Sequence, residues 1–429
     1  MMKKNGVLLL GHKIKHIRTE KGISQENMAR AIKSSKSFVQ RLEVGQTECS
    51  SDMLTKIKNF LEIENAPLLE DEVEMFKDRI WVWNGLLDAN RAADAREMRS
   101  EMAPILDLPF EQELFVLFKM IDIKLLTKEM NLSDAEEKLN EVEPLLESAS
   151  DEALFIYHTT KGFVDAILKR EYRSAVKHYL QTLNIVSDYV KPDATVLSNL
   201  GVIYLGLCKP CHAIIYLERV LGEYDIDRTH LDKPKATAML ATAYMYLGEY
   251  KKAKELFETA LVLAKSIKHE VLTGVILVNM SYLNFYTGNY KQAVELCQEG
   301  AKYVNDNDSK CMTFYKKGIC HYKLKEFDEC KKAIEHGRAL SNGDKRLSIF
   351  FNSLEHLINL NDNNSATYIE ETAIPFFSTC DNIDKFVALE LCRELEAHYM
   401  KKRAKTRAWA IAAIARDVYE DIFMKEIDI

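Results

Sequence analysis

The chain has 429 residues, more than one compact core accommodates, and 47% of them are hydrophobic, as in ordinary globular proteins. Only 8 prolines and 16 glycines leave few turns for this length, which favours long helices over many short strands. The net charge of −7 is unevenly distributed: residues 1–61 carry twelve Lys or Arg against five Asp or Glu, and the remaining residues carry 46 against 60. A basic segment joined to an acidic body is typical of a nucleic-acid-binding module attached to a domain without that role.

Several classes of protein are disfavoured by what the sequence lacks. The N-terminal apolar run, residues 7–10, is too short for a signal peptide, and no stretch approaches 18 apolar residues, so we expect a cytoplasmic protein without a membrane partner. Nine cysteines, an odd number, fit reduced thiols better than a disulfide framework, and Cys208 and Cys211 are interpreted as two thiols at a helix–helix turn. No metalloprotease motif, phosphate loop or nucleophile motif is present, so we expect neither an enzyme nor a bound metal or cofactor.

The basic segment is predicted to form four short helices. Ile14 and Ile17 lie on one face of the first, which ends at Gly22, and Ser24 is placed to cap the second. The third helix is expected over about residues 35–44, ending before Gly45, and a fourth follows with apolar residues up to residue 61.

These helices resemble the Xre/Cro family of helix-turn-helix domains, through the residues Ile14, Arg18, Gly22-Ile23-Ser24-Gln25, Met28-Ala29, Ser35-Lys36-Ser37, Val39, Arg41-Leu42-Glu43 and Gly45. In that family the third helix enters the major groove of DNA. The resemblance implies that Lys36, Ser37 and Arg41 read base edges, and that Gln25 holds a phosphate. The full expected set of DNA-contacting residues is Gln25, Ser35, Lys36, Ser37, Gln40 and Arg41. Arg18 and Glu43 are expected to form an internal salt bridge instead.

The acidic body contains internal repeats. Residues 237–264 resemble the tetratricopeptide pattern, in which small residues such as Ala241, Ala253 and Ala260 let two antiparallel helices approach closely. Steps of 36 to 40 residues from Ala253 find counterparts across the body, which predicts nine helical hairpins over residues 75–420, with small residues at Ala95, Ala135, Ala175, Ala213, Ala253, Ala293, Cys330, Ala366 and Ala404. The predicted fold is therefore all-α: a helix-turn-helix bundle followed by a right-handed tetratricopeptide superhelix.

The inner face of such a superhelix is a candidate peptide site. Alignment of the repeats on their small residues places Asn199, Asn279 and Asn352 at equivalent positions of this face. A carboxamide both donates and accepts hydrogen bonds and so matches the backbone of an extended peptide. The expected peptide-binding set is completed by four further side chains that would set specificity, namely Lys235, Met239, Tyr282 and Tyr286.

A Xre-type domain followed by tetratricopeptide repeats resembles the RRNPP family of bacterial and phage quorum-sensing receptors. The resemblance divides the chain into a DNA-binding domain over residues 1–61, a linker over residues 62–74 containing Pro67, and a peptide-sensing and dimerisation domain over residues 75–429. It implies a homodimeric transcription regulator that binds double-stranded operator DNA and is controlled by a short signalling peptide.

Two alternatives remain open. In a Rap-like protein the region 75–120, with Trp81, Trp83 and Gln112, would bind or sequester a response regulator. In the other, the repeats serve only for oligomerisation or for recruiting a protein partner.

Overall fold

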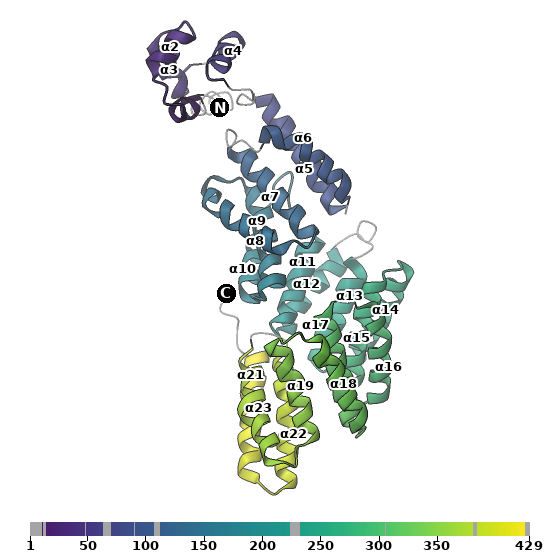
Figure 1. Ribbon diagram of the computed structural model, residues 1–429. Helices are drawn as coiled ribbons and strands as arrows, with labels where there is room; N and C mark the ends of the chain where they lie inside the picture. The colour runs from purple at the N-terminus through teal and green to yellow at the C-terminus, as the bar shows by residue number, and fades with distance from the viewer. Residues whose placement is uncertain are drawn as a thin grey trace. The chain divides into compact units, whose positions relative to one another are not determined.

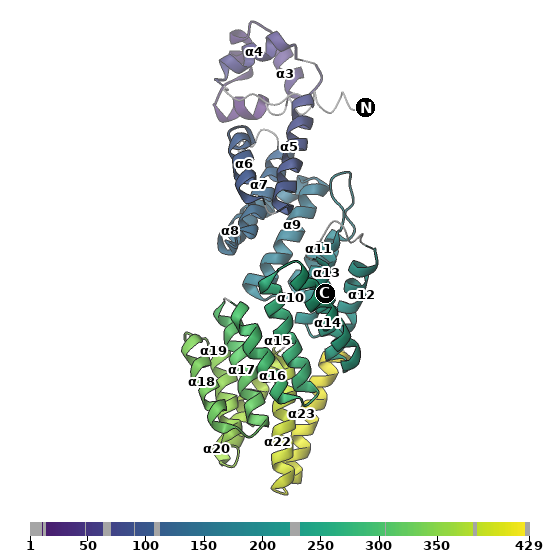
Figure 2. The same ribbon diagram turned by 90° about the vertical axis from the view of Figure 1, so that its right-hand side faces the viewer.

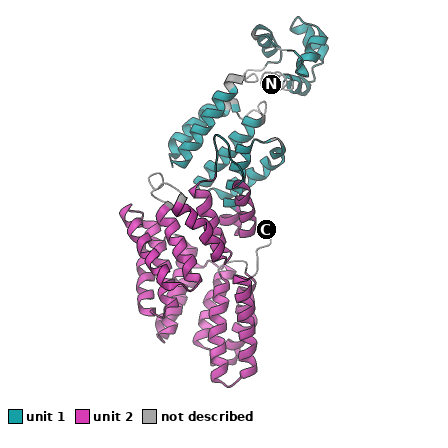
Figure 3. Cartoon of the chain, turned by 180° about the vertical axis from the view of Figure 1, so that it is seen from behind, with its two compact units in different colours: residues 1–164, 184–191 teal, residues 165–183, 192–429 magenta. Residues whose placement is uncertain are grey.

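In a computed structural model of the chain, residues 11, 14–47, 49–62, 70–89, 91–106, 112–223, 232–304, 306–380 and 384–424 are described. Every regular element in these ranges is helical, and no strand occurs in them, which confirms the predicted fold class. The chain divides into two compact units, residues 1–164 with 184–191 and residues 165–183 with 192–429 (Figure 3).

The N-terminal bundle begins with a helical segment over residues 14–20. It continues with α2 (Gln25–Ala31), α3 (Lys36–Glu43) and α4 (Ser51–Phe60), which are visible at the purple end of Figure 1. Ser24, Ser35 and Ser50 cap these three helices, and each hydroxyl accepts a hydrogen bond from the backbone N–H three residues later. Their apolar faces form one small core with the first helical segment, whose buried members are Ile14, Ile17, Met28, Ala29, Ile32, Val39, Leu42, Leu54, Ile57 and Leu61.

The remaining helices form consecutive antiparallel hairpins, seen in two views in Figures 1 and 2. In the first unit these are α5 (Glu70–Asp88), α6 (Ala92–Leu106), α7 (Gln112–Lys128), α8 (Leu132–Val142) and α9 (Asp151–Val164). In the second unit they are α10 (Tyr172–Thr182), α11 (Ala194–Gly206), α12 (Pro210–Glu223), α13 (Asp232–Tyr246), α14 (Tyr250–Ser266), α15 (Glu270–Tyr286), α16 (Tyr290–Gly300), α17 (Asn307–Lys323), α18 (Phe327–Leu340), α19 (Lys345–Ile358), α20 (Asn363–Tyr368), α21 (Ile374–Thr379), α22 (Lys385–Lys401) and α23 (Lys405–Phe423).

The predicted small residues mark the second helix of each hairpin. From Ala95 in α6 to Ala366 in α20, each lies at the fourth position of its helix and is at most 4% exposed, as close packing of neighbouring helices requires. The last repeat is displaced by one turn from the prediction. Ala404 precedes α23, and Ala408, which is fully buried, occupies the fourth position instead. With that correction, eight hairpins lie within the described parts of the two units, and α10, which carries Ala175, lies near the start of the second unit.

The turn inside most hairpins has one residue in the left-handed conformation, two positions before the second helix. Glycine supplies it at Gly248 and Gly288, with φ of 81° and 80°. Other residues do so elsewhere, as at Met130, Arg170 and Cys208, with φ between 58° and 59°. A residue with a Cβ atom is strained in this conformation, so the turn geometry is imposed by the packing of the two helices rather than by the local sequence.

Two predicted boundaries differ from the structure. The predicted linker over residues 62–74 extends too far, since α5 begins at Glu70; residues 63–69, including Pro67, lie outside the described residues. The predicted single domain over residues 75–429 is divided between the two compact units near residue 165, where α9 ends and a π-helical turn begins.

The C-terminal hairpin α22–α23 packs back against earlier repeats of the second unit. The Phe386 ring stacks on Tyr246 of α13 with centroids 4.5 Å apart, and Arg346 of α19 makes two hydrogen bonds to Asp384, at 2.6 and 2.9 Å. The Lys209 ammonium donates to the last carbonyls of α23, those of Asp421 and Ile422. The hairpin thereby places α22 opposite the first helices of the central repeats.

Candidate functional site

The first candidate site is the outer face of α3. Val39 and Leu42 point into the bundle core and are fully buried. The opposite face is exposed and carries the residues expected to contact DNA, Ser35, Lys36, Ser37, Gln40 and Arg41. A 3.3 Å hydrogen bond from Arg41 Nε to the Ser37 carbonyl joins two of them. The structure therefore brings five of the six expected residues onto one accessible surface.

A buried ionic network holds this helix in place. Arg18 donates from Nε and Nη2 to the Glu43 carboxylate, at 2.5 and 3.0 Å, and from Nη1 to the Ile23 carbonyl at 2.6 Å. Glu43 is 1% exposed, which confirms the expected internal pair. Gln25, expected to hold a phosphate, also joins this network, because its amide donates to Glu43 at 2.7 Å. A side-chain hydrogen bond from Gln25 to a phosphate thus has to use its remaining amide hydrogen.

The second candidate site lies among the central repeats of the second unit. It is a cavity of about 150 Å³, called here the larger cavity. Side chains of α13, α15, α17 and α22 and the residue before α22 line it: Met245, Tyr246, Asn279, Tyr282, Tyr286, Met312, Tyr315, Lys316, Asp384, Phe386, Val387 and Glu390. Three residues of the expected peptide-binding set, Asn279, Tyr282 and Tyr286, are among them.

The other expected peptide-binding residues are not brought to this cavity. Asn199 donates to the buried Tyr179 hydroxyl at 2.9 Å, and Asn352 accepts from Arg338 at 2.6 Å. Lys235 and Met239 lie half-buried on α13, outside the lining. The three asparagines share a repeat position but not an environment, because each is engaged by a different neighbour: Asn279 donates to the Thr242 hydroxyl at 3.5 Å.

The cavity wall is aromatic and neutral apart from two ion pairs. Burial raises the pKa of the Tyr246, Tyr282, Tyr286 and Tyr315 hydroxyls, so all four are protonated at neutral pH. The pairs are Arg346–Asp384 and Lys316–Glu390. Such a lining suits apolar and aromatic side chains of a ligand, with a few polar groups to orient them.

Lys316 is a residue of this site that the sequence interpretation missed. It lies fourteen residues before Cys330, as Asn279 lies fourteen before Ala293, so the same repeat alignment could have found it. The repeat pattern of the sequence did not indicate Glu390. It belongs to α22, and only the packing of the C-terminal hairpin brings it to α17.

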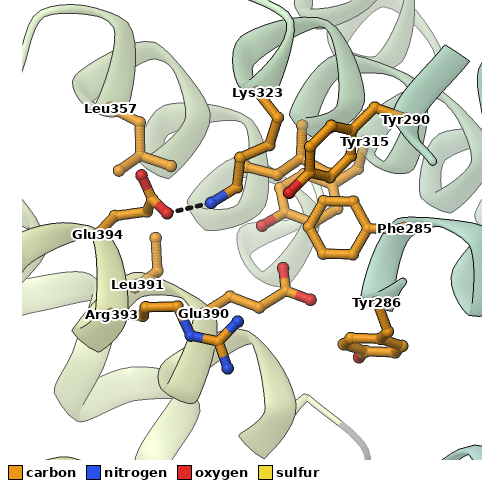
Figure 4. A pocket seen from close by; sticks show the side chains of 11 residues that line it. Phe285, Tyr286, Tyr290, Tyr315, Lys323, Leu357, Glu390, Leu391, Arg393 and Glu394 are labelled. Carbon is orange, nitrogen blue, oxygen red and sulfur yellow. Dashed lines mark hydrogen bonds and ion pairs between the residues drawn. The ribbon is translucent and has the colours of Figure 1, made fainter. Parts of the chain in front are cut away.

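A smaller cavity of about 50 Å³ adjoins the larger one, and Tyr286, Tyr315 and Glu390 belong to both linings. Figure 4 shows its side chains, with Lys323 of α17 paired to Glu394 of α22 and the Arg393 guanidinium beside Glu390. The Tyr322 hydroxyl also donates to Glu394, at 3.1 Å. Glu390 thus stands in the wall between two spaces.

Neither a metal centre nor a membrane span is found in the described residues. They contain no group of three or more His, Cys, Asp or Glu side chains arranged to hold a metal ion. None of their helices combines the length and apolarity needed to cross a bilayer.

Comparison with known proteins agrees with both parts of the fold. Residues 14–64 match the helix-turn-helix family, and residues 235–302 match the tetratricopeptide repeat family. The transcriptional activator NprA of Geobacillus stearothermophilus is 20% identical over 389 residues, covering 86% of this chain and 93% of NprA.

Two solved structures share the fold over most of the chain. A Rap protein complexed with competence and sporulation factor has a TM-score of 0.70 at 15% identity, covering 81% of this chain and 98% of that one. NprR in complex with its cognate peptide NprX has a TM-score of 0.63 at 19% identity, covering 80% of this chain and 99% of that one. In this combination of a helix-turn-helix domain with tetratricopeptide repeats, the chain is similar to NprA in sequence and to NprR in fold.

Proposed function

We propose that the protein is a cytoplasmic transcription regulator that binds operator DNA through α3 and is controlled by a short signalling peptide bound among its repeats. One observation supports the proposed DNA binding. The face of α3 that carries Lys36, Ser37, Gln40 and Arg41 is exposed, and a buried ion pair holds the opposite side of this helix in the bundle. Arginine and lysine on the outer face of a recognition helix are the side chains best suited to guanine edges and phosphates. The similarity to a transcriptional activator supports the same role.

The peptide-binding half is supported by the larger cavity. It combines apolar and aromatic walls with the Asn279 carboxamide, which can pair with a peptide backbone. The solved structure of NprR, which has a similar fold, contains its cognate peptide NprX. Because the C-terminal hairpin packs back on the central repeats, a ligand bound between α13 and α22 can favour one arrangement of the hairpin against those repeats and so alter DNA affinity.

The DNA-binding half is tested by selection of duplexes from a random pool with the full chain, followed by titration of the selected duplex. We expect Arg41→Ala to weaken binding by about tenfold or more, because a bidentate arginine–guanine contact contributes about 1–3 kcal/mol. Lys58→Ala, a change of an α4 lysine outside the expected contact face, is the matched control. Failure to select any duplex would contradict the proposal.

We further propose that the protein acts as a homodimer through α23. Trp409 and Tyr419 on this helix are 68% and 49% exposed, which is unusual for large aromatic side chains. The helix is basic near its start, with Lys405 and Arg407, while Asp417 and Glu420 near its end pair with Arg416 at 3.8 and 3.9 Å, so the exposed aromatic side chains rather than charge support this interface. Light scattering after chromatography checks this: Trp409→Ser is expected to convert dimer to monomer, and an unchanged dimer would refute the interface.

A further inference from the structure

The Lys316 ammonium is buried with incomplete pairing. Lys316 is 2% exposed, and its Nζ lies 4.1 Å from the centre of the Tyr282 ring, 4.0 Å from that of Phe285 and 5.6 Å from that of Tyr286. Its carboxylate neighbour in the described structure is Glu390, at 3.6 Å, which is beyond a direct hydrogen bond. The aromatic faces stabilise the charge but accept no conventional hydrogen bond, so three N–H donors remain poorly satisfied.

Glu390 is the other half of this loose pair. Its Oε1 faces Lys316, and its Oε2 is buried without a hydrogen-bond partner in the described part of the chain. The neighbouring ion pairs do form hydrogen bonds. Arg346 donates two to Asp384, and Glu394 accepts one from Lys323 and one from Tyr322. Buried charges that lack hydrogen bonds are costly, and the cost is relieved when a ligand supplies the missing partners.

The two side chains of this ion pair differ in how far they can move. Lys316 is enclosed by the rings of α15 and cannot leave without opening the repeat core. The Glu390 side chain is 14% exposed and borders the smaller cavity, where Lys323 and Arg393 supply positive charge (Figure 4). An incoming group can therefore replace Glu390 at the fixed ammonium while Glu390 turns toward the other cations.

We infer that the larger cavity contains a carboxylate-binding subsite built on Lys316, which takes a carboxylate of the signalling peptide in exchange for Glu390. This inference rests on the proposed peptide-binding function. A cationic ligand group would meet the enclosed ammonium at short range, whereas a carboxylate completes its hydrogen bonds, and Asn279 lines the same cavity and adds a donor. Because Glu390 belongs to α22, the exchange also removes one of the ion pairs between the C-terminal hairpin and α17 and thus couples the ligand to that hairpin.

Synthetic heptapeptide mixtures test the subsite with the full chain. One mixture has free C-terminal carboxylates, a second is amidated, and a third is amidated and lacks Asp and Glu. Each is incubated with the protein, which is separated by gel filtration, and retained peptides are quantified by mass spectrometry. Retention is expected to be at least about tenfold higher for carboxylate-bearing peptides than for the third mixture, since charge-assisted hydrogen bonds are about twice as strong as neutral ones. The first two mixtures distinguish a terminal carboxylate from an acidic side chain.

Two substitutions complete the test. Lys316→Met keeps an unbranched side chain, one atom shorter and without the charge, and is expected to abolish the preference for carboxylates, whereas Glu390→Gln removes the competing carboxylate and is expected to increase retention severalfold. If Lys316→Met does not fold, as judged by circular dichroism, the double variant with Glu390→Gln removes both charges and must also lose the preference. Equal retention of all three mixtures by the unmodified protein would overturn the carboxylate subsite but leave peptide binding intact. Retention of none of them would contradict both.

Discussion

The buried network behind α3 gives a quantitative prediction for Glu43→Ala. Glu43 accepts three hydrogen bonds, two from Arg18 and one from Gln25, and is 1% exposed. Removing the carboxylate leaves the buried guanidinium with only the Ile23 carbonyl as a partner in this network, and breaking a buried pair in this way costs about 3–5 kcal/mol. A bundle of this size has a total stability of about 3–7 kcal/mol. The substitution is therefore expected to unfold a large fraction of the bundle.

Hydrogen exchange followed by mass spectrometry measures the unfolding of the N-terminal bundle, segment by segment, in the full chain. Peptides covering α2 and α3 are expected to lose most of their protection in Glu43→Ala, while peptides from α13 to α18 remain as protected as before. Operator binding is expected to fall in parallel. In contrast, Arg41→Ala, on the exposed face of the same helix, is expected to lose operator binding with no change in exchange.

A double variant separates the ion pair from general damage. Arg18→Met with Glu43→Leu replaces the pair by apolar side chains and is expected to restore most of the protection, because buried ion pairs are often replaceable without loss of stability. Protection of α2 and α3 that is unchanged in Glu43→Ala would refute the reasoning. So would a double variant less stable than the single one.

Three further predictions concern the repeats. Gly248→Ala, at φ 81°, is expected to destabilise the second unit by about 1 kcal/mol, whereas Gly85→Ala, on the exposed face of α5 with open space around it, is expected to stabilise by a similar amount; urea titrations measure both. Burial lowers the pKa of His356, so the folded state binds a proton at this side chain less readily than the unfolded state, and the free energy of unfolding falls as pH drops below about 6.5. His356→Gln should make the free energy of unfolding less dependent on pH between pH 7 and 5. An unaltered pH profile would contradict this role of His356. Thiol labelling of the native protein should modify the exposed Cys211 first and leave Cys320, whose pKa burial raises to about 12, unmodified until unfolding.

The repeat architecture was predictable because its physical cause is local. A small residue at the fourth position of each second helix is needed wherever two helices approach closely, and that requirement recurs at readable intervals from Ala95 to Ala366. Ala404 was misassigned because it lies within the 36- to 40-residue step from Ala366, whereas Ala408, which occupies the position in the structure, lies beyond that step. Only the left-handed turn at Arg403, which starts the helix at Lys405, distinguishes them.

The exposed face of α3 was predictable for a similar reason, and the lining of the larger cavity only in part. On α3, alternation between buried Val39 and Leu42 and exposed neighbours orients every side chain once the helix is known. Among the repeats, equivalent position did not imply equivalent environment, because Asn199 and Asn352 are engaged by Tyr179 and Arg338. The Lys316–Glu390 pair joins residues 74 positions apart through the packing of the last hairpin, which no local pattern encodes.

Control of α3 by a peptide among the repeats is the part of the proposed function that most needs a direct measurement. The affinity of the full chain for its selected duplex can be measured by fluorescence anisotropy with and without a peptide that the protein retains. We expect the peptide to change the dissociation constant of the protein–DNA complex at least about fivefold, the lower limit of typical coupling between sites. The change should disappear in Lys316→Met, while that variant binds DNA as the unmodified protein does without peptide. Identical DNA-binding curves with and without a bound peptide would contradict the claim.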